Sequence, residues 1–207
     1  MPADWLDRVE KRLGFLSLPG LPAFLAGMNA AVGVLTLFKP DFAAALDLDP
    51  SGLKAGEFWR VISFLFIPTQ TAPLWLAVWV VLLYSLMRGL EAAWGDFRLT
   101  VFWLTGAAAM ALAAVSCGTV LSNGPLLLSL GLAFAQVYPD MQLMLFFIFP
   151  VKVRWLAALG WAWAAWGACF GDATTRVAIL AGLANYALFF GSGHWQQLRR
   201  HLRRASR

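Results

Sequence analysis

The sequence offers few side chains that could carry out nucleophilic chemistry. Ser122 and Ser129 are each followed by one residue and then a glycine, but neither has a glycine two residues before it. A serine hydroxyl becomes a nucleophile only beside a base, and histidine is the base whose pKa suits neutral pH. The two histidines, His194 and His201, lie in the basic C-terminal segment. We therefore predict no general base beside either serine and assign no catalytic residue.

Two other kinds of reactive site also find little support. Lysine can replace histidine as a base, but Lys54 precedes both serines by a long stretch. Lys152 is predicted to lie at the opposite face of the membrane. A metal site would need histidines, or paired acidic residues within one apolar segment, and none of the apolar segments contains them. The sequence therefore predicts no metal ion and no other cofactor.

The composition points to lipid as the solvent for most of the chain. Of the 207 residues, 60% are hydrophobic and 13% are charged, and the mean hydropathy is +0.69. Soluble domains have nearly twice that share of charge, and a small globule cannot hide so much apolar surface. The net charge of +5 comes from arginines of the last nine residues. It therefore indicates a membrane face rather than a nucleic-acid partner.

The apolar segments predict an all-α, polytopic membrane protein. Residues 1–20 read as an amphipathic cytoplasmic segment, residues 21–192 as the transmembrane domain and residues 193–207 as a basic cytoplasmic tail. Prolines, glycines and charges divide the domain into six spans. The predicted spans are about 21–38, 72–90, 99–117, 118–138, 153–170 and 177–190.

The distribution of positive charge predicts the orientation. Six spans place both ends of the chain on one side of the membrane. Most of the 16 Lys and Arg residues then fall on that side, in the N-terminal segment, the loops after the second and fourth spans, and the tail. Loops rich in Lys and Arg face the cytoplasm. Both termini are therefore predicted to be cytoplasmic.

Three motifs, in this order, resemble the rhomboid superfamily, which includes rhomboid proteases and derlins. The first is Phe58-Trp59-Arg60 in a long loop after the first span. The second, from Glu91 through Gly95 to Arg98, resembles the Glu-x-x-x-Gly-x-x-Arg pattern at the end of the family's second helix. The third joins the fourth and fifth spans and runs from Tyr138-Pro139-Asp140 through a strand-like apolar run to Pro150, Lys152 and Trp155.

The resemblance implies a six-helix rhomboid-like bundle with a set of structural residues. We expect Glu91 and Arg98 to form a structural clamp and Gly95 to allow the turn between them. Gly182 is a small residue that would let the last spans approach closely. The predicted structural motif residues are Trp59, Arg60, Glu91, Gly95, Arg98 and Gly182.

The residues that rhomboid proteases use for catalysis have no counterpart. The stretch that corresponds to their Gly-x-Ser motif reads Val120-Leu121-Ser122-Asn123-Gly124-Pro125. Ile179 stands about where the family has its histidine, and the second span lacks the family's His and Asn. The chain thus resembles the pseudoproteases and derlins. That resemblance implies that it binds transmembrane segments of other membrane proteins and affects their degradation, trafficking or stability.

Three amides within or near the spans are candidates for contact with such client segments: Asn123, Gln136 and Asn185. Amides in lipid need hydrogen-bond partners and often join helices. The alternative is therefore a cross-helix bond between Asn123 and Asn185. The partners predicted for the protein are the lipid bilayer and transmembrane clients.

Two other functions stay open from the sequence. The first is a rhomboid-family intramembrane serine protease with an atypical site. The second is a small transporter or a subunit of a membrane complex. Neither has a supporting motif, because the spans contain no histidine and no charge near their centres.

Overall fold

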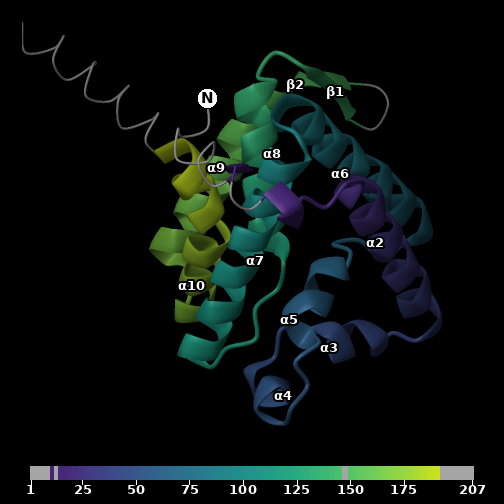
Figure 1. The fold of residues 1–207 in the computed structure, drawn as a ribbon, viewed down its shortest axis with the longest axis vertical. Helices are drawn as coiled ribbons and strands as arrows, with labels where there is room; N and C mark the ends of the chain where they lie inside the picture. Colours follow the sequence, from purple (N-terminus) through teal and green to yellow (C-terminus); the bar gives the residue numbers. More distant parts are fainter. Residues whose placement is uncertain (1–9, 12–13, 146–148, 192–207) are drawn as a thin grey trace, which may run out of the picture.

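The computed structural model describes residues 10–11, 14–145 and 149–191, and it is almost entirely helical (Figure 1). The basic tail, His194 and His201 lie outside the described residues, as does most of the amphipathic segment at the N-terminus. Six of the described helices overlap the predicted spans. They are α2 (Leu21–Phe38), α6 (Pro73–Trp94), α7 (Asp96–Cys117), α8 (Gly124–Val137), α9 (Val153–Phe170) and α10 (Ala173–Gly182).

Among the described residues, four helical segments are long and apolar enough to cross a membrane. These are α2, α6, α7 and the segment Ala173–Gly191, which combines α10 with the helical residues that follow it. The multi-pass membrane class predicted from composition is thereby supported. The shorter helix α8 has 14 residues and is nevertheless apolar.

Proline and glycine set the helix boundaries. Prolines occupy the first turns of α2, α6 and α8. Backbone N–H groups in the first turn have no acceptor within the helix, so the missing N–H of proline costs no hydrogen bond there. Gly95 joins α6 to α7 with φ +85°, a conformation that a side chain would strain. The predicted turn at Gly95 is confirmed. At the start of α10, the Asp172 carboxylate accepts a hydrogen bond of 2.9 Å from the Thr175 N–H.

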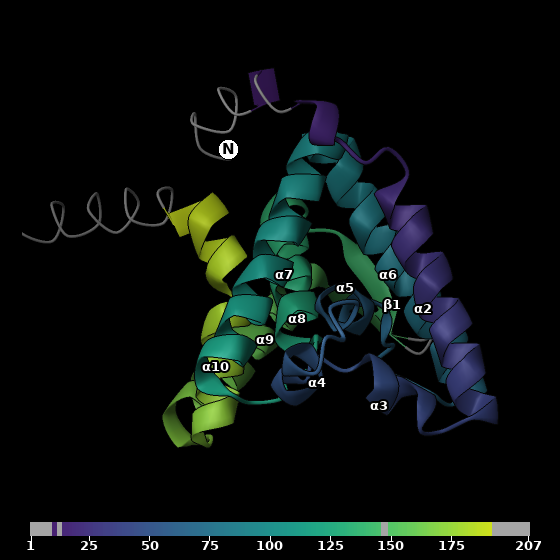
Figure 2. The same cartoon turned by 60° about the horizontal axis from the view of Figure 1, so that its bottom comes forward.

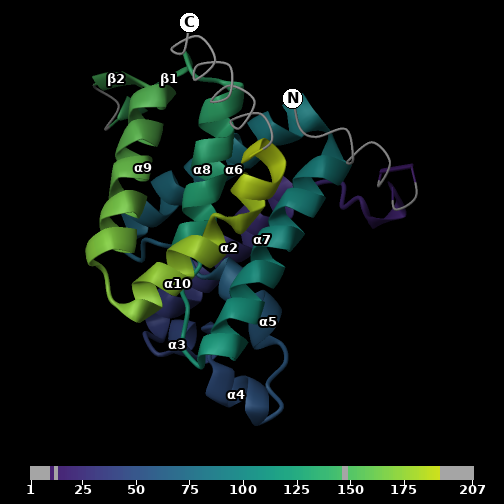
Figure 3. The ribbon, with the colours of Figure 1, turned by 90° about the vertical axis from the view of Figure 1, so that its left-hand side faces the viewer.

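Two smaller elements lie at opposite ends of the molecule (Figures 1 and 3). At one end, the long loop after α2 folds into α3 (Phe42–Leu46), α4 (Pro50–Lys54), α5 (Arg60–Ser63) and the 3₁₀ turn η2 (Phe64–Phe66). At the other end, β1 (Gln142–Leu145) pairs antiparallel with β2 (Phe149–Lys152). This hairpin adds a small two-stranded sheet to a fold predicted as all-α. The other short element is the 3₁₀ turn η1 (Gly14–Leu16).

Helix α8 lies at the centre of the helix packing and contacts α6, α7, α9 and α10. Helices α2 and α6 pack against each other. At one end of the molecule this pair diverges from α7 and α8, and α3–α5 lie in the space between the two groups (Figure 2). The outer face of α9 carries tryptophans that are exposed in the isolated chain, including Trp155 and Trp166. A tryptophan-rich exterior is expected for a helix that contacts lipid.

Gly182 brings α10 against the first turn of α8. A Cβ atom added there would lie 2.4 Å from the Cβ of Pro125 and 2.9 Å from the backbone nitrogen of Leu126. The two backbones could not come this close if residue 182 had a side chain. The predicted role of Gly182 as a close-approach residue is confirmed.

Candidate functional site

Ser122 and Ile179 line the same cavity. These are the two positions where the resemblance would place the serine and histidine of a rhomboid protease. The cavity has a volume of about 430 Å³ and lies between the loop before α8, the start of α10 and the first long loop. Trp163 of α9 and Thr174 and Thr175 of α10 complete much of its wall.

A carboxylate also lines this cavity, although the sequence predicted no general base beside Ser122. Leu48 and Leu121 form an isolated antiparallel bridge in which the Leu121 N–H donates to the Leu48 carbonyl at 3.3 Å. In that register the preceding residue, Asp47, lies opposite Ser122. The two leucines are buried in the core, whereas Asp47 and Ser122 both line the cavity. Sequence reasoning missed this pair because only a contact between distant segments creates it.

The cavity nevertheless lacks the arrangement that serine catalysis requires. Within the described residues, Ser122 and Asp47 form no hydrogen bond with each other, and Ile179 has no atom that can accept a proton. The other candidate serine, Ser129, is fully buried and donates to the Leu126 carbonyl at 2.7 Å. That bond is common for a serine in a helix and leaves the hydroxyl in a structural role.

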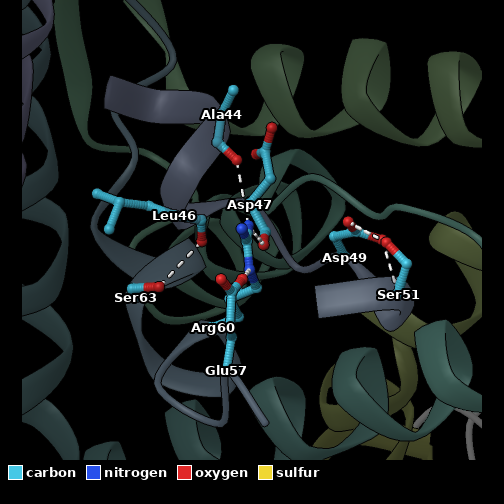
Figure 4. A network of polar contacts seen from close by, with 8 residues as sticks. All are labelled: Ala44, Leu46, Asp47, Asp49, Ser51, Glu57, Arg60 and Ser63. Atoms are coloured by element: carbon cyan, nitrogen blue, oxygen red, sulfur yellow. Dashed lines mark hydrogen bonds and ion pairs between the residues drawn. The ribbon is translucent and has the colours of Figure 1, made fainter. Parts of the chain in front are cut away.

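Arg60 organises the loop that supports Asp47 (Figure 4). Its Nη1 donates to the backbone carbonyls of Ala44 at 3.2 Å and Asp47 at 3.1 Å, and its Nε pairs with Glu57. Gly52 packs against this ion pair, since a Cβ there would lie 2.5 Å from the Arg60 Nε. The predicted structural role of Arg60 is therefore visible as contacts. The neighbouring Trp59 is 57% exposed.

Acidic groups of the loops differ in how their surroundings affect ionisation. Partial burial raises the pKa of the Asp47 carboxyl, and the nearby Arg60 guanidinium opposes that shift only in part. Hydrogen bonds from Ser51 lower the pKa of Asp49, and hydrogen bonds from Thr175 lower the pKa of Asp172. Asp47 is thus the loop carboxylate whose charged form is least well stabilised of these three.

The predicted clamp between Glu91 and Arg98 is replaced by two ion pairs with other partners. Glu91 is buried and pairs with Arg88, which lies one helical turn earlier on α6. Arg98 pairs with Glu10 at 3.4 Å and thereby joins α7 to the N-terminal segment. The expected partner was wrong because the turn at Gly95 separates Arg98 from the face of α6 that carries Glu91.

The expected bond between Asn123 and Asn185 is also not formed, because each amide binds backbone elsewhere. The Nδ2 of Asn123 donates to the carbonyls of Phe64 at 3.0 Å and Ile67 at 2.8 Å, so it joins α8 to η2. The Nδ2 of Asn185 donates to the Phe102 carbonyl of α7 at 3.1 Å. Both side chains are buried. Their amide groups are therefore engaged within the protein rather than presented to a client.

The third predicted amide, Gln136, is exposed near the end of α8 and hydrogen-bonds the hydroxyl of Tyr186. A further buried amide, Asn29, was not predicted. Its Nδ2 donates to the Leu25 carbonyl at 3.0 Å, and its Oδ1 accepts from the Trp79 Nε1 at 3.4 Å. Asn29 therefore joins α2 to α6. The sequence did contain a signal for this contact, because Asn29 lies within an apolar span and an amide in lipid needs a hydrogen-bond partner.

A second cavity, almost entirely apolar, lies between α6, α8 and α9. Its volume is about 340 Å³, and Leu82 and Leu86 of α6, Leu128 of α8 and Leu156 of α9 are among its lining residues. Gly131 of α8 also lines it, and a Cβ added there would meet no atom within 4 Å. The central helix therefore has no side chain at this position, and the cavity is open beside it.

No family model, no curated protein and no solved structure matches this chain. Its function must therefore be inferred from its own residues. In the part of the chain that the structure describes, no three His, Cys, Asp or Glu side chains are grouped so that they could hold a metal ion.

Proposed function

We propose that this chain is a non-catalytic, rhomboid-like membrane protein that binds transmembrane segments of other membrane proteins. The apolar cavity between α6, α8 and α9 carries the proposal. Helices α6, α8 and α9 supply most of its lining, together with Thr69 of a loop and Leu143 of β1. We infer that an occupant enters between these helices from the bilayer. Such an occupant must itself be apolar, and a transmembrane helix meets this condition with its side chains. Handling of membrane proteins in quality control or trafficking is the corresponding cellular role.

Three features support the rhomboid-like assignment within this proposal. Arg60 of the first motif forms a partly buried ion pair with Glu57, and Glu91 of the second motif is buried. The positions matched to the rhomboid serine and histidine line one cavity although they are distant in sequence. The six helices follow the predicted order.

The orientation that we propose keeps both termini in the cytoplasm. The ion pair of Glu10 with Arg98 connects the N-terminal segment to the α6–α7 turn. Lys152 and Arg154 of the hairpin region lie within 4 Å of the Asp140 carboxylate, at 3.7 and 3.5 Å. An end of the molecule rich in such cations is the end expected to face the cytoplasm.

Filling the apolar cavity should prevent client binding. We expect Gly131→Trp to reduce crosslinking of a single-span, Leu/Ala-rich peptide bearing photoreactive leucines by about tenfold in vesicles, a loss of roughly 1.4 kcal/mol of binding free energy. Gly27→Trp is the matched control, because a Cβ at Gly27 on α2 also meets no atom within 4 Å. Equal crosslinking of the two variants, or crosslinks that map only to the outer face of α2, would contradict the proposal. Crosslinking of lipid but not peptide in the cavity would indicate a lipid site instead.

An intramembrane serine protease is the second candidate, and the position of Asp47 opposite Ser122 favours it. A carboxylate is a weak base for a serine hydroxyl, and no hydrogen bond joins these two residues in the described part of the chain. We therefore expect no labelling of Ser122 by a fluorophosphonate and no cleavage of a model transmembrane substrate. Labelling and cleavage that both disappear in Ser122→Ala and in Asp47→Asn would establish the protease and overturn the non-catalytic function.

A further inference from the structure

The cavity that contains Ser122 has an unusual charge distribution. Asp47 is the one charged side chain among the described residues that line it. Its carboxylate forms no hydrogen bond or ion pair within the described part of the chain, and Figure 4 shows it pointing away from the Arg60 guanidinium. The cavity therefore presents a half-buried negative charge that no side chain of the protein neutralises by direct contact.

The nearest cations are engaged with other groups. Arg60 pairs with Glu57 and donates to the backbone carbonyls of Ala44 and Asp47. On α10, Arg176 donates to the Cys169 carbonyl at 3.1 Å. The start of α10 is positive because of its helix dipole, but Asp172 caps it and adds a second carboxylate there. The low-dielectric walls strengthen the field of Asp47 inside the cavity.

The remaining walls suit an organic cation. Trp163 lines the cavity and is 54% exposed, so an aromatic side chain forms part of the wall. Cations are attracted to the face of an indole ring. Hydroxyl oxygens of Ser122, Thr174 and Thr175 can accept hydrogen bonds from an ammonium or guanidinium group. The same carboxylate would repel an anionic ligand.

This cavity adjoins the apolar cavity at Gly124. Gly124 lines both of them, at the start of α8, and has no side chain to separate them. A helix that occupied the apolar cavity would therefore end, on the side of α3–α5, beside the carboxylate of Asp47.

We propose that Asp47, Trp163 and the neighbouring hydroxyls bind the side chain of a Lys or Arg located near the end of the bound client segment. The proposal rests on the proposed function, and it specifies which clients the protein prefers. A basic residue near a membrane interface can extend its charged group out of the hydrocarbon. The cavity would receive that group and neutralise it.

A peptide series tests the preference. Three photoreactive single-span peptides differ at one residue near the end that would face α3–α5, which is Lys, Gln or Glu. We expect the protein in vesicles to crosslink the Lys peptide about tenfold more efficiently than the Gln peptide. A tenfold difference corresponds to about 1.4 kcal/mol of binding free energy, which is roughly what a hydrogen bond to a charged group contributes. The Glu peptide should be captured least.

Variants of two aspartates assign the preference to the cavity. Asp47→Asn should abolish the preference for Lys, and Asp47→Lys should reverse it in favour of Glu. Asp49→Asn removes the same charge from the same loop, but Asp49 binds Ser51 rather than lining the cavity, so the preference should persist. A preference that survives Asp47→Asn, or that Asp49→Asn abolishes equally, would overturn the proposal.

Folding of the variants can be checked independently. Arg60 binds the backbone carbonyl of Asp47, so the substitutions leave that contact in place. Burial raises the pKa of Asp47, so its ionisation destabilises the folded state at neutral pH, and this cost disappears as the pH falls below 3.8, the ordinary value. Asp47→Asn should therefore melt at the same or a higher temperature than the wild type at pH 7. A lower melting temperature would show that Asp47 is a structural residue and would overturn the assignment.

Competition with butylammonium distinguishes a site for a client side chain from a site for free amines. Addition of butylammonium should reduce capture of the Lys peptide to the level of the Gln peptide and leave the Gln peptide unaffected. Equal capture of Lys and Gln peptides would overturn this proposal while the proposed function stands. Failure to capture any peptide would overturn both, and butylammonium binding that depends on Asp47 would then identify a site for free amines.

Discussion

Gly182→Ala is expected to destabilise the protein by about 1–3 kcal/mol, the range for an added methyl group in a tightly packed contact. The new Cβ would lie 2.6 Å from the carbonyl carbon of Pro125, and backbone at the start of α8 cannot move aside as a flexible side chain can. The effect should appear as a lower melting temperature in detergent, followed by tryptophan fluorescence. It should also reduce the yield of folded protein.

Gly27→Ala is the control for this substitution. It introduces the same methyl group within α2, at a position where no atom lies within 4 Å of the new Cβ. Alanine favours the helix over glycine by about 1 kcal/mol. Gly27→Ala should therefore be neutral or stabilising. A melting temperature for Gly182→Ala that equals that of Gly27→Ala would show that α8 and α10 do not approach closely at residue 182.

Asn123→Asp is expected to cost about 2–4 kcal/mol of stability. The substitution keeps the size of the side chain but replaces its NH₂ group with an oxygen that faces the Phe64 and Ile67 carbonyls. Two buried acceptors then lose their donor, each at roughly 1–3 kcal/mol, although protonation of the new carboxyl would recover part of the loss. Melting temperatures at pH 7 and pH 4 measure both effects, with the lower temperature expected at pH 7.

Ser122→Ala serves as the comparison, because the adjacent Ser122 is exposed and its removal leaves no buried group without a partner. Its melting temperature should differ little from that of the wild type. If Asn123→Asp were as stable as Ser122→Ala, the amide of Asn123 would not join α8 to η2. It would then again be a candidate for client contact.

Local signals in the sequence determined the helices and their order. Apolar runs of sufficient length, interrupted by Pro73, Gly95 and Pro125, predicted helices that overlap those of the structure, although α8 begins six residues later than predicted and α10 begins four residues earlier. Gly95 was correctly predicted as a turn because its positive φ depends on a few neighbouring residues. Gly182 was correctly predicted as a contact because small residues in apolar helices mark close packing.

Only the tertiary structure decided which polar residues meet. Asn123 binds carbonyls 59 and 56 residues earlier, and Asn185 binds one 83 residues earlier. The predicted bond between these two amides was therefore wrong. Glu91 pairs with Arg88 rather than Arg98 because the direction of the α6–α7 turn, and not its sequence spacing, sets the distance. Asp47 and Ser122 line the same cavity because a single bridge joins Leu48 to Leu121. Periodicity describes one element at a time, whereas the candidate sites form where elements distant in sequence pack together.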